Sequence, residues 1–281
     1  QKTLRETIRF MLTFMRKRQI AQYADAATSY YFNRYPVDSE VIAQEESITF
    51  SYGDYGDYFD GLLQHKCGSF HIFINLNRLE LPYKPRTRYT FAHELGHYFI
   101  DEHRIALQNG LVPSHPSFNQ LISSKNPVEK EADFFASCLL MPERFMRQEC
   151  QRRPLSSTLI QHIQDTFNVS TTAAIFRYFE LSMFPMSIIC CKEGKILWSM
   201  RTDDFTFKWL PQKGDSVPIN TIAGDFFNGR SKSENEEIVY SDDWFPNNTR
   251  DNDTELYEKC YYLNANTIIS LIWVRERRIS Y

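Results

Sequence analysis

The stretch FAHELGHYF, residues 91–99, decides how the first half of the chain folds. Apolar residues repeat in it at helical spacing: Phe91, Leu95, Tyr98 and Phe99. Proline is favoured in the first turn of a helix, and Pro85 lies a few residues upstream. We therefore expect one continuous helix from Pro85 to Leu107.

The same stretch contains the pattern HExxH, in which His93 and His97 enclose Glu94. Side chains four residues apart lie one above the other on a helix, so both imidazoles can bind one ion. Zinc held by two imidazoles and a carboxylate lowers the pKa of its bound water toward about 7. Glu94 would take a proton from that water as it attacks a peptide carbonyl, and pass it to the leaving amine. The pattern predicts a zinc peptidase with one ion per chain.

The third ligand has to come from another part of the sequence. Glu129 and Glu131 both lie on the next predicted helix, EKEADFFASCLLM. Glu129 shares its helix face with Ala132 and Ala136, and such small residues allow two helices to approach closely. This favours Glu129, and Glu131 stays open as an alternative ligand.

His103 is a further alternative, because it follows His93 by ten residues, as in the zinc motif HExxHxxGxxH. That motif requires a glycine where this chain has Ile100. On a helix that continues past Ile100, His103 points about 120° away from His97. A surface or substrate-binding role therefore suits His103 better than ligation.

Asp133 stands one helical turn after Glu129. A carboxylate there can accept the second ring proton of a ligand histidine and orient the ring, and we predict this role for Asp133. Glu129 and Asn126 also have the spacing of a capping box, so Glu129 could simply close the helix start. The donor that stabilises an oxyanion is left open among Tyr98, His103 and Arg104.

Upstream of the helix, residues 46–77 consist of short β-like runs and end in the alternating segment FHIFINLN at 70–77. We expect a small antiparallel sheet here. A strand beside the active site can bind a peptide by β-addition, and we choose His71 to Asn75 as that strand.

Downstream, the composition becomes strand-rich after residue 183. Two short amphipathic helices, about 156–167 and 170–182, precede this change and are spaced like a helix-turn-helix unit. The second has a single basic residue, Arg177, so we interpret the pair as core helices. We expect an α+β protein with two domains: residues 1–183, including the helix-turn-helix-like segment 156–182, and residues 184–281.

The composition limits the classes of partner. The 281 residues are 42% hydrophobic, enough for a substantial core, and 32 basic against 35 acidic residues give a net charge of -3. This balance gives no reason to propose broad binding to nucleic acid or to membranes. The first residues are too charged for a secretory signal, and no apolar run is long enough to span a bilayer. We expect a soluble, cytoplasmic protein with reduced cysteines.

Two segments together resemble a known family. FAHELGHYF, followed by EKEADFFASCLLMP at 129–142, is similar to the ImmA/IrrE metallopeptidases, and the resemblance extends from about residue 35 to 183. It implies a zincin-like fold in which Glu129 supplies the third zinc ligand. Asp133 stands where many members have asparagine, which preserves hydrogen bonding to a ligand but changes the charge.

The rest of the chain is similar in layout to longer members with a smaller, α/β GAF-like sensory domain. Family members are typically intracellular proteases that cleave a helix-turn-helix repressor and so induce stress, mobile-element or antiphage genes. The resemblance implies a repressor encoded nearby as substrate. The separate, strand-rich composition of the C-terminal domain suggests that it senses a signal, and we expect an activating ligand or single-stranded nucleic acid there. The alternative is a non-proteolytic ligand-sensing or DNA-binding regulator with a degenerate zinc site.

Overall fold

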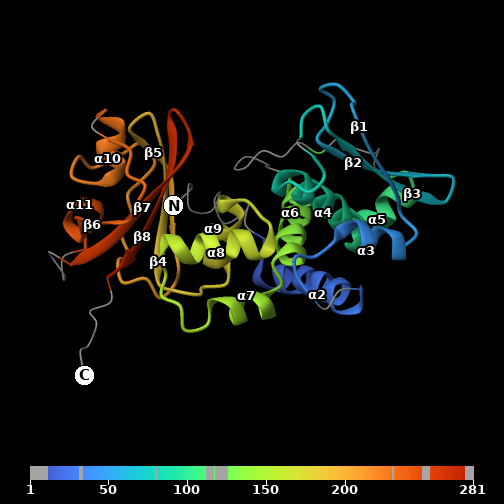
Figure 1. Ribbon diagram of the computed structural model, residues 1–281, viewed down its shortest axis with the longest axis horizontal. Helices are drawn as coiled ribbons and strands as arrows, with labels where there is room; N and C mark the ends of the chain where they lie inside the picture. The colour runs from blue at the N-terminus through green and yellow to red at the C-terminus, as the bar shows by residue number, and fades with distance from the viewer. Residues whose placement is uncertain are drawn as a thin grey trace. The chain divides into compact units, whose positions relative to one another are not determined.

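The structure, a computed structural model, describes residues 12–31, 34–79, 81–111, 117, 126–229, 231–248 and 254–275. Helices and strands mix in an α+β arrangement that divides into two compact units (Figure 1). The first unit comprises residues 1–151 and 161–177, and the second comprises residues 152–160 and 178–281. Among the described residues, every helix is too short or too polar to cross a membrane.

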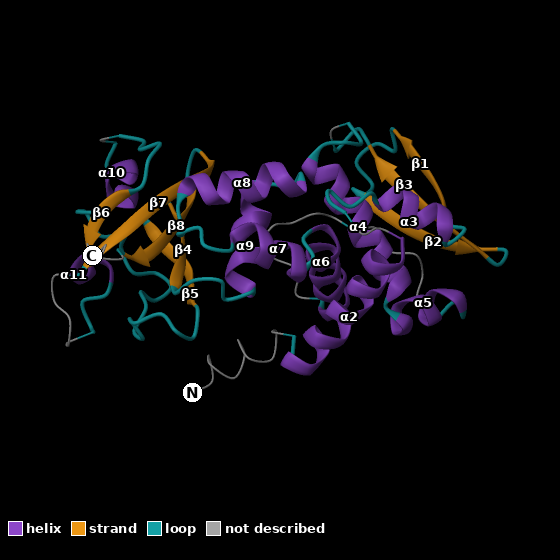
Figure 2. Ribbon diagram, turned by 60° about the horizontal axis from the view of Figure 1, so that its bottom comes forward, coloured by secondary structure: helices purple, strands orange, loops and turns teal. Residues whose placement is uncertain are grey.

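The first unit is mainly helical (Figure 2). Its helices are α2 (Phe14–Tyr31), α3 (Ser39–Glu45), α4 (Pro85–Phe99), α5 (Asp101–Gln108), α6 (Pro127–Leu140) and α7 (Glu143–Cys150). Helices α8 (Ser157–Phe167) and α9 (Thr171–Glu180) follow, and each contributes residues to both units. Its strands are β1 (Thr49–Gly53), β2 (Gly61–Lys66) and β3 (Ser69–Asn75).

The three strands form a sheet in the order β1-β3-β2. A tight hairpin joins β2 to β3 through Cys67 and Gly68, whose positive φ angles of 52° and 80° suit a two-residue turn. Strand β1 lies on the other side of β3 and runs parallel to it. The expectation of an antiparallel sheet was therefore wrong. The chain reverses direction after β1, but β2 lies one strand position away from it, and β3 fills the place between them and runs parallel to β1, so the sheet is mixed.

Strand β3 is paired on both sides, with β1 and with β2. A peptide can add only to a strand that has a free edge. The prediction that His71 to Asn75 receives a substrate strand was therefore wrong, and β2 is the edge strand that lies against helix α4 (Pro85–Phe99).

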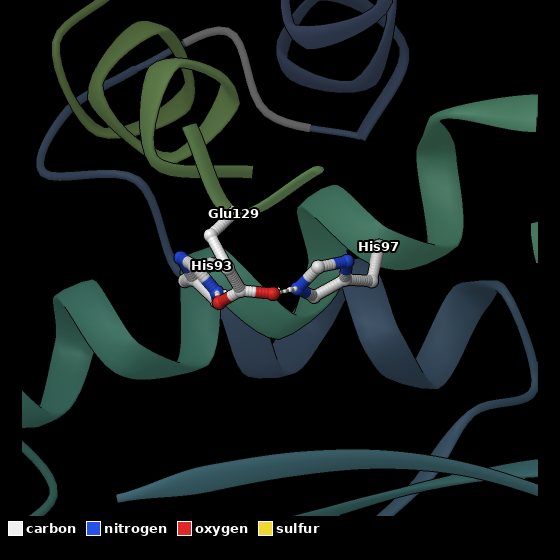
Figure 3. Close-up of side chains that lie close together, drawn as sticks. All are labelled: His93, His97 and Glu129. Carbon is white, nitrogen blue, oxygen red and sulfur yellow. Dashed lines mark hydrogen bonds and ion pairs between the residues drawn. The ribbon is translucent and has the colours of Figure 1, made fainter. Parts of the chain in front are cut away.

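Helix α4 lies between this sheet and α6 (Figures 1 and 3). Its apolar residues Phe91 and Leu95 are buried, as are Leu63, Ile72 and Ile74 of the sheet. Helix α2 packs against α6 on the side away from the sheet. The helix that contains HExxH is thus the centre of the first unit.

The sequence had predicted one continuous helix from Pro85 to Leu107, and this prediction was wrong. Helix α4 ends at Phe99, and Ile100 is extended, with φ -80° and ψ 107°. Ile100 is fully buried, and Asp101 and Glu102 occupy the first turn of α5, where acidic residues are favourable. The break at Ile100 buries its side chain and turns α5 into a new direction.

Besides parts of α8 and α9, the described residues of the second unit form a five-stranded antiparallel sheet and two short helices. Its strands are β4 (Met186–Lys192), β5 (Lys195–Arg201), β6 (Glu237–Tyr240), β7 (Glu255–Asn264) and β8 (Thr267–Val274), in the order β5-β4-β8-β7-β6. The helices are α10 (Ile222–Phe227) and α11 (Ser241–Trp244). Its core includes Phe205, Phe207, Trp244 and Phe245. The likeness to a GAF-like domain stays a prediction.

Candidate metal centre

Helix α4 supplies three of the candidate side chains from one buried turn. His93, Glu94 and His97 are only 3%, 1% and 3% exposed. The spacing of four residues places the two imidazole rings on the same helix face, with their centroids 4.9 Å apart. Their Nε2 atoms lie 3.2 Å from each other. The sequence pattern thus produces two nitrogens that converge on one point.

The close approach of α4 and α6 brings the third side chain to this point. A Cβ atom on Gly96 would lie 3.0 Å from the Cα of Ala132, so only glycine fits at position 96 without a shift of the backbone. Glu129 lies in the first turn of α6, after the N-cap Asn126, which accepts a hydrogen bond from Val128 N. From there Glu129 extends between the two imidazoles (Figure 3).

The ligand atoms of His93, His97 and Glu129 all lie within 4.8 Å of one another. Glu129 Oε2 is 3.2 Å from His93 Nε2, and Glu129 Oε1 is 3.5 Å from His97 Nε2. Zinc ligands at 2.0–2.1 Å in tetrahedral geometry are about 3.3 Å apart. Because two imidazole nitrogens and a carboxylate are also the donor types that zinc prefers, these residues fit a zinc ion.

Asp133 lies behind His93, on the side away from the ligand atoms. Its Oδ1 is 2.9 Å from His93 Nδ1 and accepts a hydrogen bond of 3.1 Å from the hydroxyl of Tyr89. Burial opposes protonation of His93, but the hydrogen bonds to Asp133 and Glu129 outweigh it and raise its pKa to about 10. The contact is the one that orients a ligand histidine in many metal sites, and that role for Asp133 stays a prediction.

His103 and Glu131, the two alternative third ligands, do not reach the converging atoms. The break at Ile100 brings His103 Nδ1 to 3.2 Å from His97 Nδ1, the ring nitrogen on the far side from Nε2. Glu131 Oε2 is 3.1 Å from His103 Nε2. His103 is 7% exposed, and burial lowers its pKa. The two residues contact each other rather than the candidate ion position.

Glu94 lies against the start of β2. A Cβ atom on Gly61 would lie 2.6 Å from Glu94 Oε1 and 2.6 Å from Thr90 Cγ2. Asp60, the residue before it, is 1% exposed and accepts hydrogen bonds from Arg78 and Arg86. These contacts hold the edge strand directly against the carboxylate of Glu94. Sequence reasoning missed Gly61, because only the fold brings β2 to this helix.

The three donors named for an oxyanion are all engaged elsewhere. The Tyr98 hydroxyl donates a hydrogen bond of 2.9 Å to Glu46, and the Arg104 guanidinium lies over the Tyr98 ring and donates to Asp101. His103 lies behind His97, as described above. The structure therefore favours none of them as the donor.

Comparisons with known proteins agree with this geometry. Residues 52–179 match the family model described as the IrrE N-terminal-like domain, Peptidase_M78, and this range contains His93, Glu94, His97 and Glu129. The match supports the resemblance to the ImmA/IrrE family. No curated protein matches the sequence. A solved structure, a Mycobacterium tuberculosis transcriptional regulator, is similar with a TM-score of 0.56 and 13% identity over 93% of this chain and 77% of that chain. At that identity the likeness shows the fold alone.

Proposed function

Starting from an IrrE N-terminal-like peptidase domain at residues 52–179, we propose that this protein is a zinc-dependent endopeptidase that acts in the cytoplasm. It cuts a helix-turn-helix repressor at a specific bond and so induces stress, mobile-element or antiphage genes. The observation that carries the proposal is the convergence of His93 Nε2, His97 Nε2 and the carboxylate of Glu129 beside the buried Glu94.

Each residue of the site has a distinct role. His93, His97 and Glu129 hold the ion, and Asp133 orients His93 through the contact at its Nδ1. A bound zinc ion supplies Lewis acidity and lowers the pKa of water. Glu94 takes a proton from the water that attacks the peptide carbonyl and later gives it to the leaving amine. Its burial against Gly61 holds the carboxylate in one position for both transfers.

The substrate strand adds to β2. This strand is an edge of the three-stranded sheet, and its first residue, Gly61, lies against Glu94. The start of the edge, at Asp60 and Gly61, pairs with Ser117 through backbone hydrogen bonds. The substrate therefore pairs with Leu62–Lys66, and its chain then runs along α4 toward the ion.

The second unit, in this proposal, receives the signal that licenses cleavage. Its sheet has a core of its own, separate in the chain from the metal ligands. A small ligand or single-stranded nucleic acid bound there is the proposed activator, and a repressor encoded beside the gene is the proposed substrate.

A DNA-binding regulator is the competing function, and one contact counts against it. Helices α8 and α9 bury most of their apolar faces, including Leu159, Ile163 and Ile175. Arg177 is 4% exposed and donates a hydrogen bond of 3.0 Å to the Met141 carbonyl. The single basic residue of the second helix is thus held inside the protein and is not presented to DNA.

A cleavage assay tests the proposal. The purified full chain is mixed with helix-turn-helix repressors encoded near its gene, with zinc, with a chelator, and as the Glu94→Gln variant. We expect a single cut that needs zinc and that falls by at least about 100-fold in the variant, which keeps its zinc. Cutting that persists in Glu94→Gln overturns the peptidase mechanism. Stoichiometric zinc without any cutting, together with salt-dependent binding to duplex DNA, would favour the competing function.

A further inference from the structure

The two histidines of the metal centre are supported in different ways behind their ligand atoms. His93 Nδ1 contacts a carboxylate directly, at 2.9 Å from Asp133. His97 Nδ1 contacts a second imidazole instead, at 3.2 Å from His103 Nδ1, and both rings are buried. A hydrogen bond between these two imidazoles requires one ring nitrogen to carry a proton and the other to accept it.

The positions of the ring protons on His97 and His103 follow from the choice of His97 Nε2 as the ligand atom. When Nε2 of His97 faces the ion, the ring proton of His97 is on Nδ1, so Nδ1 is a donor. His103 Nδ1 must then accept this hydrogen bond, which places the proton of His103 on its Nε2. That Nε2 lies 3.1 Å from Glu131 Oε2, a carboxylate oxygen that can only accept. Every hydrogen bond in the row has one donor and one acceptor.

The row ends on a charge that α2 holds in place. Arg16 donates hydrogen bonds to both carboxylate oxygens of Glu131, from Nε at 2.9 Å and from Nη2 at 2.5 Å. The guanidinium also donates to Glu102 on α5. The side chains of Arg16 and Glu131 are only 19% and 14% exposed, so water screens this pair weakly. Two-point contact fixes the direction of the Glu131 carboxylate.

We propose that His103, Glu131 and Arg16 form a positioning relay that orients His97 for zinc, as Asp133 does for His93. The carboxylate of Glu131 polarises the neutral imidazole of His103, which makes His103 Nδ1 a stronger acceptor for the Nδ1 proton of His97. It presupposes the zinc site of the proposed function. It also makes α2 part of the metal centre, although Arg16 lies outside the matched residues 52–179.

Zinc affinity of the full chain tests the relay, measured with zinc alone in competition with a coloured chelator. Second partners of metal-bound histidines typically contribute about 10- to 100-fold to affinity. We expect a loss in this range for His103→Phe, which removes the acceptor for His97. We expect about a 10-fold loss for Glu131→Gln, and a smaller loss for Arg16→Gln. His103→Gln keeps an acceptor and should recover part of the affinity.

Glu102→Gln is the matched control. Glu102 also binds Arg16, but it is 58% exposed and it is not the carboxylate that contacts His103 Nε2. This variant should keep the zinc affinity of the unmodified protein. In cobalt(II)-substituted protein, the visible absorption bands should shift in His103→Phe and stay unchanged in Glu102→Gln, since these bands report ligand geometry.

The outcomes separate the relay from the proposed function. If the unmodified protein binds zinc and His103→Phe and Glu131→Gln bind it equally well, the relay is wrong and the peptidase proposal stands. If the unmodified protein binds no zinc, the proposed function itself fails. Circular dichroism of the metal-free variants shows whether each one folds, and Glu131→Gln replaces His103→Phe if the larger change prevents folding.

Discussion

Each unit of this protein has a glutamate that is largely shielded from water, and the two glutamates have opposite surroundings. Glu258, on β7 of the second unit, is fully buried and collects hydrogen-bond donors. They are Ile222 N, Ala223 N, Trp244 Nε1, Cys260 Sγ and Ser270 Oγ. Burial raises the pKa of Glu258 in spite of these bonds. The cluster is complete as it stands, because the protein supplies the donors that the carboxylate needs.

Glu129 in the first unit has the reverse arrangement. Its carboxylate lies 3.2–3.5 Å from the Nε2 atoms of His93 and His97, which are themselves 3.2 Å apart. Lone pairs, rather than N–H groups, point at one another when the ring protons are on Nδ1. A cation completes such a cluster. A carboxylate that is shielded from water is thus no sign of a site in itself, whereas the convergence of several hydrogen-bond acceptors is.

The same substitution at both glutamates should therefore have different effects. Glu129→Gln replaces the carboxylate of the proposed third ligand by a neutral amide, and we expect zinc affinity to fall by more than about 100-fold, more than the loss of a partner outside the ligand shell. The free energy of unfolding of the metal-free protein should change by no more than about 1 kcal/mol, because an amide of the same shape keeps the packing and can donate a hydrogen bond to one of the two Nε2 atoms. Chelator competition and urea unfolding measure the two quantities.

Unchanged zinc affinity in Glu129→Gln would mean that Glu131 or another carboxylate is the third ligand. A large loss of stability without loss of zinc affinity would mean that Glu129, like Glu258, has a structural role, namely to close the start of helix α6.

Gly61→Ala should damage catalysis without damaging the zinc site. The added Cβ meets Glu94 Oε1 and Thr90 Cγ2 at 2.6 Å, so the carboxylate has to move. A displacement of about 1 Å in a catalytic group can cost about 100-fold in rate, and we expect such a fall in kcat/KM for the repressor. Zinc affinity should stay as in the unmodified protein. Gly53→Ala is the control, because the atoms nearest to its Cβ, at 3.0–3.2 Å, belong to the side chain of Tyr55.

These comparisons also show what the sequence could and could not reveal. The spacing of His93 and His97 fixes their shared helix face, and Asn126 and Pro127 mark the start of α6. The α+β class and the match to an IrrE-like domain followed from such local signals. Local spacing is reliable here because helix geometry alone decides it.

Contacts between distant segments were beyond the sequence. Arg16 and Glu131 are 115 positions apart, and nothing near either residue announces the pair. The helix break at Ile100 has no glycine or proline as a signal, and without that break His103 cannot face His97. The mixed sheet likewise depends on the spatial order of the strands, with β3 between β1 and β2, which strand patterns do not encode. Tertiary packing decided each of these features.

Glu258→Gln sharpens the comparison from the other side. In the variant, the amide NH2 group takes the place of a carboxylate oxygen that accepts hydrogen bonds in the unmodified protein. Each buried donor left unpaired in this way costs about 1–3 kcal/mol. We expect the unfolding free energy of the second unit to fall by about 2 kcal/mol. All four tryptophans, Trp198, Trp209, Trp244 and Trp273, belong to this unit, so tryptophan fluorescence reports its unfolding alone.

Zinc affinity should not respond to Glu258→Gln. Glu255→Gln is the control on the same strand: its carboxylate is 47% exposed and pairs with Arg275, so the change should be below about 1 kcal/mol. Equal stability of the two variants would show that the donors around Glu258 find other acceptors.

Gly96→Ala should have the smallest effect, because two contributions oppose each other. Alanine stabilises a helix by up to about 1 kcal/mol over glycine, whereas overpacking against α6 costs about 1–3 kcal/mol. We expect the free energy of unfolding of the first unit to fall by about 1 kcal/mol, measured by far-UV circular dichroism. Zinc binding should also weaken, because Glu129 moves outward. Adding Ala132→Gly should give no rescue, because the new Cβ meets the backbone Cα and carbonyl oxygen of Ala132 at 3.0 and 3.1 Å. A full rescue would mean that the Ala132 side chain, and not its backbone, sets the helix spacing that brings the third ligand to the histidines.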